Sequence, residues 1–300
     1  MDIVAVPAAF GSAICFAIAS ALEQSAVKQE KTSRPLDPRL IVRLAHRPRW
    51  LLGWVPEAGG TGLQALALNF GALALVEPIL ISGLFLAIPL AAVLNRRRVH
   101  TRDFGVVALG GVGLVAFLVA AQPRDGVPQP SLAGWLGVAL WTVPALAGCL
   151  IAAWRVQGPA RGALLGVATG LLFATGASLL KTVSAKVATD PLSVFTTWQF
   201  YALAVVGGCA ITLNQNAFES GRIAVPLTAI TITDPFVSVA IGVTAFHEKV
   251  STGWPHVGVQ VFAVLAMVSG IVLAGRSRSE RRDRSGREAR ARSAQPRQPG

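Results

Sequence analysis

The chain has 300 residues, of which 53% are hydrophobic and only 14% are charged, and its mean hydropathy is +0.56. Soluble globular proteins carry about 25% charged residues, so this composition excludes an ordinary soluble domain and indicates an integral membrane protein. The formal net charge of +12 does not indicate nucleic-acid binding, because the basic residues cluster outside the apolar runs and the basic C-terminal segment has no interleaved aromatic residues. We therefore expect membrane lipid, and no nucleic acid, as a partner.

Nine apolar segments are long enough to be transmembrane helices, which need about 20 residues to cross the hydrocarbon core. Their Leu-, Ala- and Val-rich runs lack the period-2 alternation of barrel strands. We expect an all-α integral membrane protein with spans at residues 3–22, 50–72, 77–95, 104–121, 132–153, 162–181, 193–213, 222–245 and 254–274. The second and third spans are divided at Glu77-Pro78, since Glu77 is the only charged residue between Ala58 and Leu94.

The positions of the basic residues predict the orientation. If the nine spans alternate, all but four of the 27 Lys and Arg residues lie on one side of the membrane. The exceptions are Arg124, Lys181, Lys186 and Lys249. The positive-inside rule then predicts a multi-pass protein of the cytoplasmic membrane, with the N-terminus outside and the C-terminus in the cytoplasm. Residues 276–300 are Arg-rich and lack apolar anchors, so we expect a disordered cytoplasmic tail that contacts anionic lipid.

Two segments of the N-terminal half recur, in the same order, in the C-terminal half. Residues 11–22 (GSAICFAIASAL) resemble 168–179 (ATGLLFATGASL), and residues 63–78 resemble 211–226. Because the offset is five spans, the two copies are expected to run in opposite directions, as in many secondary transporters with a site near the midplane. The expected units are a first repeat at 1–131, a linking span at 132–161, a second, inverted repeat at 162–275 and the tail at 276–300.

Each copy also contains a proline near the start of a span and a charged turn at its end. The first block runs from Ala74-Leu75-Val76-Glu77-Pro78 to Asn95-Arg96, and the second from Ile223-Ala224-Val225-Pro226 to His247-Glu248-Lys249. These blocks resemble the EamA-like members of the drug/metabolite transporter superfamily. The extra helix between the halves is similar to the NIPA-type branch of that superfamily. The resemblance implies secondary transport, and the NIPA-type branch, whose members are described as magnesium transporters, implies a divalent cation as cargo.

Asp234 is the first candidate for a functional residue, because an ionisable group at membrane depth usually faces a cavity, a partner or a pathway. It lies midway along the eighth span, near Thr228 and Thr231, and Pro235 cannot donate to the carbonyl of Thr231, which predicts a local break. A freed carbonyl, threonine hydroxyls and a carboxylate together can bind a metal cation such as Mg²⁺ or a protonated amine. The alternative is a kinked helix whose aspartate caps its own backbone.

Further pathway candidates are the polar residues Glu57, Gln64, Glu77 and Asn214. Glu57 and Glu77 can instead be interfacial, and the two amides can serve hydrogen bonds between helices. Gly162, Gly166 and Gly170 form two overlapping G-x-x-x-G steps, which predict close helix packing. We expect His247 and Glu248 to have a structural role in a turn outside the membrane.

No Walker A, G-x-S-x-G or H-E-x-x-H motif occurs in the sequence, so we expect neither an enzyme nor a bound cofactor. The expected function is secondary transport of a small solute or ion. Two alternatives stay open: a NIPA-like magnesium or divalent-cation transporter with Asp234 as a metal ligand, and a non-transporting membrane scaffold. A homodimer is compatible with the sequence.

Overall fold

The computed structural model describes residues 2–27, 48–94, 101–219, 224–251, 253, 258–263, 265–266 and 269. Regular structure in this part of the chain is helical. The helices are α1 (Asp2–Val27), α3 (Pro48–Phe70), α4 (Leu73–Leu94), α5 (Thr101–Ala121), α6 (Leu132–Arg155), α7 (Pro159–Thr189), the short 3-10 helix η1 (Ser193–Thr196), α8 (Trp198–Glu219) and α9 (Ala224–Thr244). Residues 258–263 are also helical. Most of the expected span at 254–274, and the tail at 276–300, lie outside the described residues.

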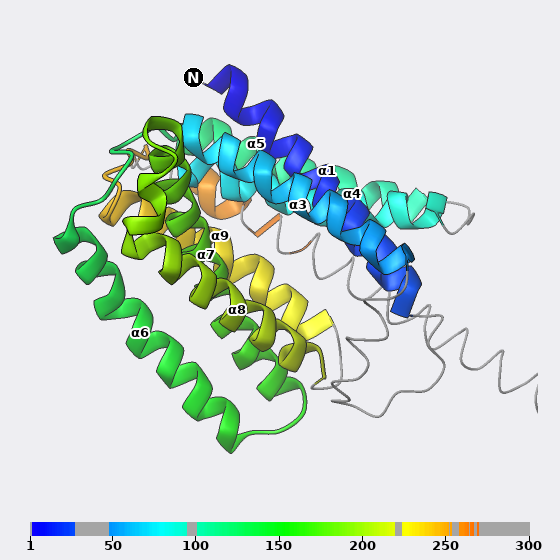
Figure 1. The fold of residues 1–300 in the computed structure, drawn as a ribbon. Helices are drawn as coiled ribbons and strands as arrows, with labels where there is room; N and C mark the ends of the chain where they lie inside the picture. The colour runs from blue at the N-terminus through cyan, green and yellow to red at the C-terminus, as the bar shows by residue number, and fades with distance from the viewer. Residues whose placement is uncertain are drawn as a thin grey trace, which may run out of the picture.

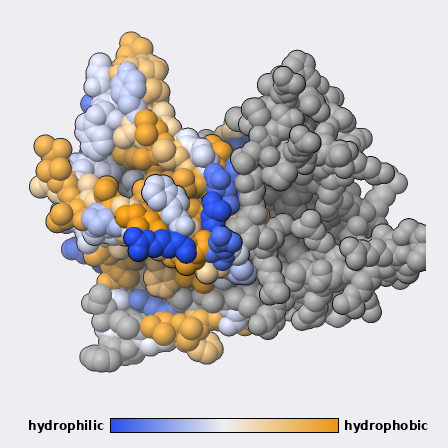
Figure 2. Space-filling model, turned by 90° about the horizontal axis from the view of Figure 1, so that it is seen from below, coloured by the Kyte–Doolittle hydropathy of each residue, from blue (hydrophilic) through white to orange (hydrophobic). Residues whose placement is uncertain are grey.

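Several of these helices have the length and apolarity of membrane spans. Three of the described helices can cross a membrane by length and composition: Leu132–Arg155, Pro159–Thr189 and Val225–Thr244. Shorter apolar helical segments are Ile3–Ala19, Leu73–Gly83 and Ala108–Ala121. Large apolar side chains lie on the surface, such as Leu140 and Trp154 on α6, which are 78% and 85% exposed. On the face shown in Figure 2, hydrophobic residues cover much of the described surface and hydrophilic residues lie among them. The described part of the chain is therefore all-helical, and its apolar helices indicate membrane association.

The helices form two groups with the same packing pattern. Helix α1 packs against α3 and α4, and α7 packs against α8 and α9. Figure 1 shows α1, α3, α4 and α5 together in one part of the molecule and α6 to α9 in the other. The two groups meet through contacts of α4 with α9 and of α3 with α7, while α6 lies at the edge against α7.

Glycines permit the closest contacts between these helices. A Cβ atom added at Gly83 would lie 2.6 Å from the carbonyl oxygen of Ala13, where α4 crosses α1. On α7, a Cβ added at Gly166 would lie 2.7 Å from the carbonyl oxygen of Pro226, and a Cβ added at Gly170 would lie 2.7 Å from the Cβ of Thr233. The packing role predicted from the G-x-x-x-G pattern is thus confirmed for Gly166 and Gly170.

Many helix ends meet at one end of the bundle, which we call the capped end. It is defined by the junction between α3 and α4, residues 121–135, Trp198 and residues 246–251. The contacts that join these parts are the Arg124–Lys249 backbone bridge, the bond from the Ser251 amide to the Ala121 carbonyl, and the ring contacts of Trp135 with Trp198 and Phe246. Helices α4, α6 and α8 therefore begin at the capped end, and α5 and α9 end there.

Two local predictions were wrong. Helix α4 begins at Leu73, after a bend at Gly71, so Glu77 lies one turn inside the helix and not at its start. The reason is a distant cap, since the carboxylate of Glu248 accepts the amides of Leu73 and Ala74. Helix α9 runs through Pro235 without the expected break. Packed neighbouring helices and local hydroxyl groups allow a membrane helix to retain such a proline.

Candidate functional site

Two carboxyl groups lie on helices that pack against each other, α4 and α9. Glu77 on α4 is 4% exposed, and Asp234 on α9 is half-buried. The two side chains are close enough for their charges to interact. The amide Nε2 of Gln64 on α3 donates to Glu77 Oε1 at 3.0 Å, and the hydroxyl of Ser238 donates to Asp234 Oδ1 at 3.5 Å. We call Glu77 and Asp234 the carboxyl pair.

The packing of α7 fixes the position of Asp234. The missing side chain of Gly170 allows the α7 backbone to approach α9, and a Cβ added there would lie 3.1 Å from the backbone nitrogen of Asp234. Ser238 follows one turn later, is fully buried, and holds the carboxylate from the same face of α9. The carboxyl pair is thus held between helices from both groups.

Like charges in an apolar environment repel strongly, because the low dielectric constant screens them little. Burying either carboxylate without a compensating charge is also unfavourable. A cation or a proton between Glu77 and Asp234 removes both penalties, and the amide of Gln64 and the hydroxyl of Ser238 supply further oxygen atoms. The arrangement can therefore bind a metal cation, a protonated amine or a proton.

The other predicted site residues do not all join this pair. The hydroxyl of Thr231 donates to the carbonyl of Leu227 at 2.6 Å and to that of Thr228 at 3.2 Å, so it bonds within its own helix. Glu57 is exposed on α3, two turns before Gln64. The Oδ1 atom of Asn214 on α8 is buried without a hydrogen-bond partner.

Potential metal ligands form no larger cluster among the described residues. No group of three or more His, Cys, Asp or Glu residues suited to a metal ion occurs in the described part of the chain. Magnesium is commonly held by one or two carboxylates and retains several water molecules, so two carboxylates are a sufficient protein contribution for that ion. Asp234 as a metal ligand stays a prediction.

A second polar cluster lies at the capped end, around the buried ion pair of Lys181 and Glu248. Lys181 Nζ lies 2.7 Å from Glu248 Oε1 and donates to the carbonyl of Gly71 at 2.9 Å. Glu248 Oε1 accepts the amide of Leu73 at 2.7 Å, and Oε2 accepts that of Ala74 at 3.1 Å. The ammonium group also lies 5.2 Å from the ring centre of Phe246. Sequence analysis placed Glu248 in a structural turn but did not reveal its contact with α4.

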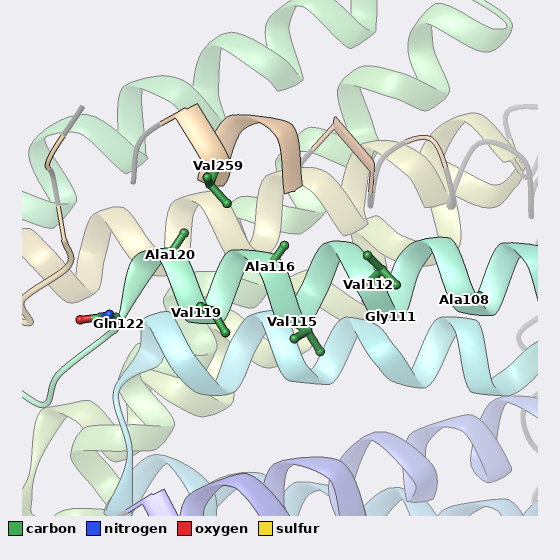
Figure 3. A pocket seen from close by; sticks show the side chains of 9 residues that line it. All are labelled: Ala108, Gly111, Val112, Val115, Ala116, Val119, Ala120, Gln122 and Val259. Carbon is green, nitrogen blue, oxygen red and sulfur yellow. The ribbon is translucent and has the colours of Figure 1, made fainter. Parts of the chain in front are cut away.

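Two grooves on the described surface are lined by residues other than the carboxyl pair. The larger, about 900 Å³, follows α5 and is lined by Ala108, Gly111, Val112, Val115, Ala116, Val119, Ala120, Gln122 and Val259. Figure 3 shows these side chains along α5, with Val259 on the facing segment. A smaller one of about 380 Å³ lies at the α6–α7 turn and is lined by Ala153, Trp154, Val156, Gln157, Gly158 and Arg161. The larger groove is almost entirely apolar, which fits lipid better than a polar cargo.

The chain resembles an uncharacterized protein of Corynebacterium glutamicum. The two sequences are 28% identical over 271 residues, which covers 87% of this chain and 94% of the relative. No family model matches the chain, and no solved structure shows a significant match. The similarity therefore extends over nearly the whole length of both proteins but brings no known activity with it.

Proposed function

We infer that this protein is a secondary transporter that moves a small cationic solute or ion across the cytoplasmic membrane by alternating access. The observation that carries this proposal is the carboxyl pair, in which one acidic residue from each helix group lies within electrostatic reach of the other, on the packed helices α4 and α9. A site shared by two groups of helices changes its access when the groups move relative to each other. Ionisable residues inside a membrane bundle commonly mark such a pathway.

The directions of the helices support an inverted repeat. The start of α1 lies at the capped end, because an added Cβ at Gly71 would lie 2.7 Å from the Cβ of Ala5. Lys181, in the last part of α7, lies at the same end. Helix α3 ends there and α8 begins there, while α4 begins and α9 ends there. Each of the three pairs α1/α7, α3/α8 and α4/α9 thus has opposite directions, as expected for the EamA-like fold of the drug/metabolite transporter superfamily.

The charges support the proposed orientation. Arg124, Lys181 and Lys249, three of the four basic residues that the positive-inside rule assigns to the outer side, lie together at the capped end. The capped end would then face outward, with the C-terminus and the basic tail in the cytoplasm, where the tail can contact anionic lipid. A chain with nine spans has its two termini on opposite sides of the membrane, as this orientation requires.

The cargo that fits best carries a positive charge. Two carboxylates with amide and hydroxyl oxygens attract an organic ammonium ion, and the same atoms are hard oxygen donors suited to Mg²⁺. A NIPA-like magnesium transporter is therefore the second candidate, favoured by the presence of two carboxylates in one site. Stabilisation of the purified protein against heat by Mg²⁺, but not by an equal concentration of methylammonium, would favour this candidate.

Flux measurements on proteoliposomes test the proposal. The protein would be reconstituted with a pH-sensitive dye inside, and methylammonium, tetraphenylphosphonium or Mg²⁺ would be added outside. We expect at least one of these cations to drive a proton flux that Asp234→Asn and Glu77→Gln each reduce at least tenfold. The matched control is Asp190→Asn, because Asp190 is exposed after α7 and the amide oxygen of the variant can still accept the Ser193 amide. Wild-type flux in Asp234→Asn would refute the role of the carboxyl pair.

A further inference from the structure

Polar contacts at the capped end join the two groups of helices. Gly71, Leu73 and Ala74 belong to the α3–α4 junction of the first group, whereas Lys181 and Glu248 belong to the second. Three hydrogen bonds connect the two groups, two from backbone amides to Glu248 and one from Lys181 to the Gly71 carbonyl. The bond between Lys181 and Glu248, within the second group, completes the network. The start of α4 is thus held to the second group by one buried carboxylate and one buried ammonium group.

This network lies at the capped end of the bundle, and the carboxyl pair lies deeper along α4 and α9. Glu77 is one turn inside α4 from the capped amides of Leu73 and Ala74. On the facing helix, Asp234 lies ten residues before Thr244, the last residue of α9, which corresponds to about 15 Å at 1.5 Å per residue. The Lys181–Glu248 network thus stands on the capped-end side of the carboxyl pair on α4.

We propose that Lys181, Glu248 and the first turn of α4 form the gate that closes the pathway at the capped end, and that this gate opens when Glu248 releases the α4 amides. This proposal rests on the proposed transport function. The geometry joins gate and cargo site through a single rigid element, because the same helix carries the capped amides and, one turn later, Glu77.

The chemistry of the contacts suits a gate better than a permanent lock. A buried ion pair is often no more stable than an apolar replacement, so its presence is weak evidence for a purely stabilising role. When the network separates, water can solvate the Glu248 carboxylate, the Lys181 ammonium group and the free backbone amides in the first turn of α4. The polar groups then have partners in both the closed and the open arrangement, as a reversible gate requires.

Accessibility of a cysteine beside the carboxyl pair tests the gate. The native Cys15, Cys149 and Cys209 would first be replaced by alanine, and Ser238→Cys would place a thiol one turn from Asp234, on the side toward the capped end. Intact cells would be treated with a membrane-impermeant cationic thiol reagent. With the network intact we expect slow labelling of S238C, and in Glu248→Gln or Lys181→Gln at least a tenfold faster rate.

A second position calibrates the assay. Leu192 is 81% exposed in the segment between α7 and α8, next to the capped end, so Leu192→Cys reports which side of the membrane this end faces. If L192C reacts only in inside-out vesicles, the S238C rates are measured there. L192C should react at the same rate with and without the gate substitutions, which shows that the substitutions do not change the access of the reagent to this end, and the unfolding of each variant in detergent shows whether it retains its fold. The two glutamine variants are tested in parallel, so that if one of them fails to fold, the other still tests the gate.

The labelling result and the flux result are independent. Equal S238C rates in wild type and in the folded gate variants, with flux intact, would overturn the gate and leave the transport proposal standing. Faster S238C labelling in the variants, with no flux of any tested cation in wild type, would show that the network closes the bundle but would remove the transport function. Lys181→Arg retains the charge and the donors, and should keep S238C protected.

Discussion

Replacement of Lys181 by methionine isolates the energetic role of the buried ion pair. The substitution removes the ammonium group but leaves an apolar side chain of similar length on α7. Glu248 then retains only the backbone amides of Leu73 and Ala74 as donors, and the carbonyl of Gly71 loses the donor at 2.9 Å. An uncompensated carboxylate stays buried, because Glu248 is itself 3% exposed.

The expected loss follows from these contacts. Removal of one member of a buried ion pair costs about 3–5 kcal/mol. The new methionine sulfur can contact the ring of Phe246, over which the ammonium group now lies, and this returns about 0.3–1.5 kcal/mol. We therefore expect Lys181→Met to lower the free energy of unfolding by about 3 kcal/mol, more than a hundredfold in the equilibrium constant.

A double replacement separates the charge from the cap. Adding Glu248→Leu to Lys181→Met removes the uncompensated charge. The double variant keeps the Gly71 carbonyl without its donor, as in Lys181→Met, and gains two helix amides without an acceptor. Loss of a helix N-cap costs about 0.5–2 kcal/mol. The double variant should consequently be more stable than Lys181→Met alone. If the effects of the two substitutions on stability partly cancel, Lys181 and Glu248 are energetically coupled, because the effects of independent residues add.

Unfolding by sodium dodecyl sulfate in mixed micelles, followed by tryptophan fluorescence, measures these differences. Trp135 contacts Phe246 with a ring-centre distance of 6.2 Å and so reports on the capped end. Lys186→Met is the matched control, five residues along α7, and should change stability by no more than about 0.5 kcal/mol. A loss below about 1 kcal/mol in Lys181→Met, or a double variant less stable than the single one, would refute the reasoning.

Two further predictions concern helix packing and capping. Gly170→Ala should destabilise the protein by about 1–3 kcal/mol through overpacking, since the new Cβ would lie 2.7 Å from that of Thr233. Gly176→Ala, on the same helix with its nearest neighbouring atom at 3.9 Å, should be neutral or stabilise by up to about 1 kcal/mol through helix propensity; equal effects in the same unfolding assay would contradict this. Ser131→Ala removes the hydroxyl that caps α6 by accepting the amide of Gly134 at 3.2 Å, and should cost about 1 kcal/mol. Hydrogen exchange of the first-turn amides of α6 should rise, and unchanged exchange would show that the cap contributes nothing.

The sequence predicted helix positions well where apolarity alone decides them. The span expected at 132–153 coincides with helix α6, Leu132–Arg155. The span expected at 104–121 coincides with helix α5, Thr101–Ala121. Prediction failed where a helix end depends on a distant residue. The start of α4 is set by Glu248, which lies 175 positions from Leu73 along the chain, and no local pattern around Glu77-Pro78 records that contact.

The candidate site was predicted only in part, again because the sequence does not record contacts between distant residues. Asp234 was identified because a carboxyl group in the middle of an apolar segment is unusual, and the charge of a second carboxyl group, that of Glu77, does act on it. Glu77 was given less weight, because a span that begins at Glu77 places it near the headgroups, whereas the observed start at Leu73 places it inside. Ser238 was missed altogether, although its position one turn after Asp234 put it on the same helix face.

Both polar networks of the described structure act on α4, and this bears on how the two groups of helices are held together. In lipid the hydrophobic effect does not drive one helix against another, so packing and interhelical polar contacts decide which arrangement is favoured. The carboxyl pair disfavours contact of α4 with α9 unless a cation or proton is bound, while Glu248 favours contact at the start of α4. A cation or proton bound at the carboxyl pair would therefore change how strongly α4 is held against α9, and α4 is also the helix that Glu248 holds in the proposed gate. A protein with these opposing contacts one turn apart has the elements of a coupled cargo site and gate.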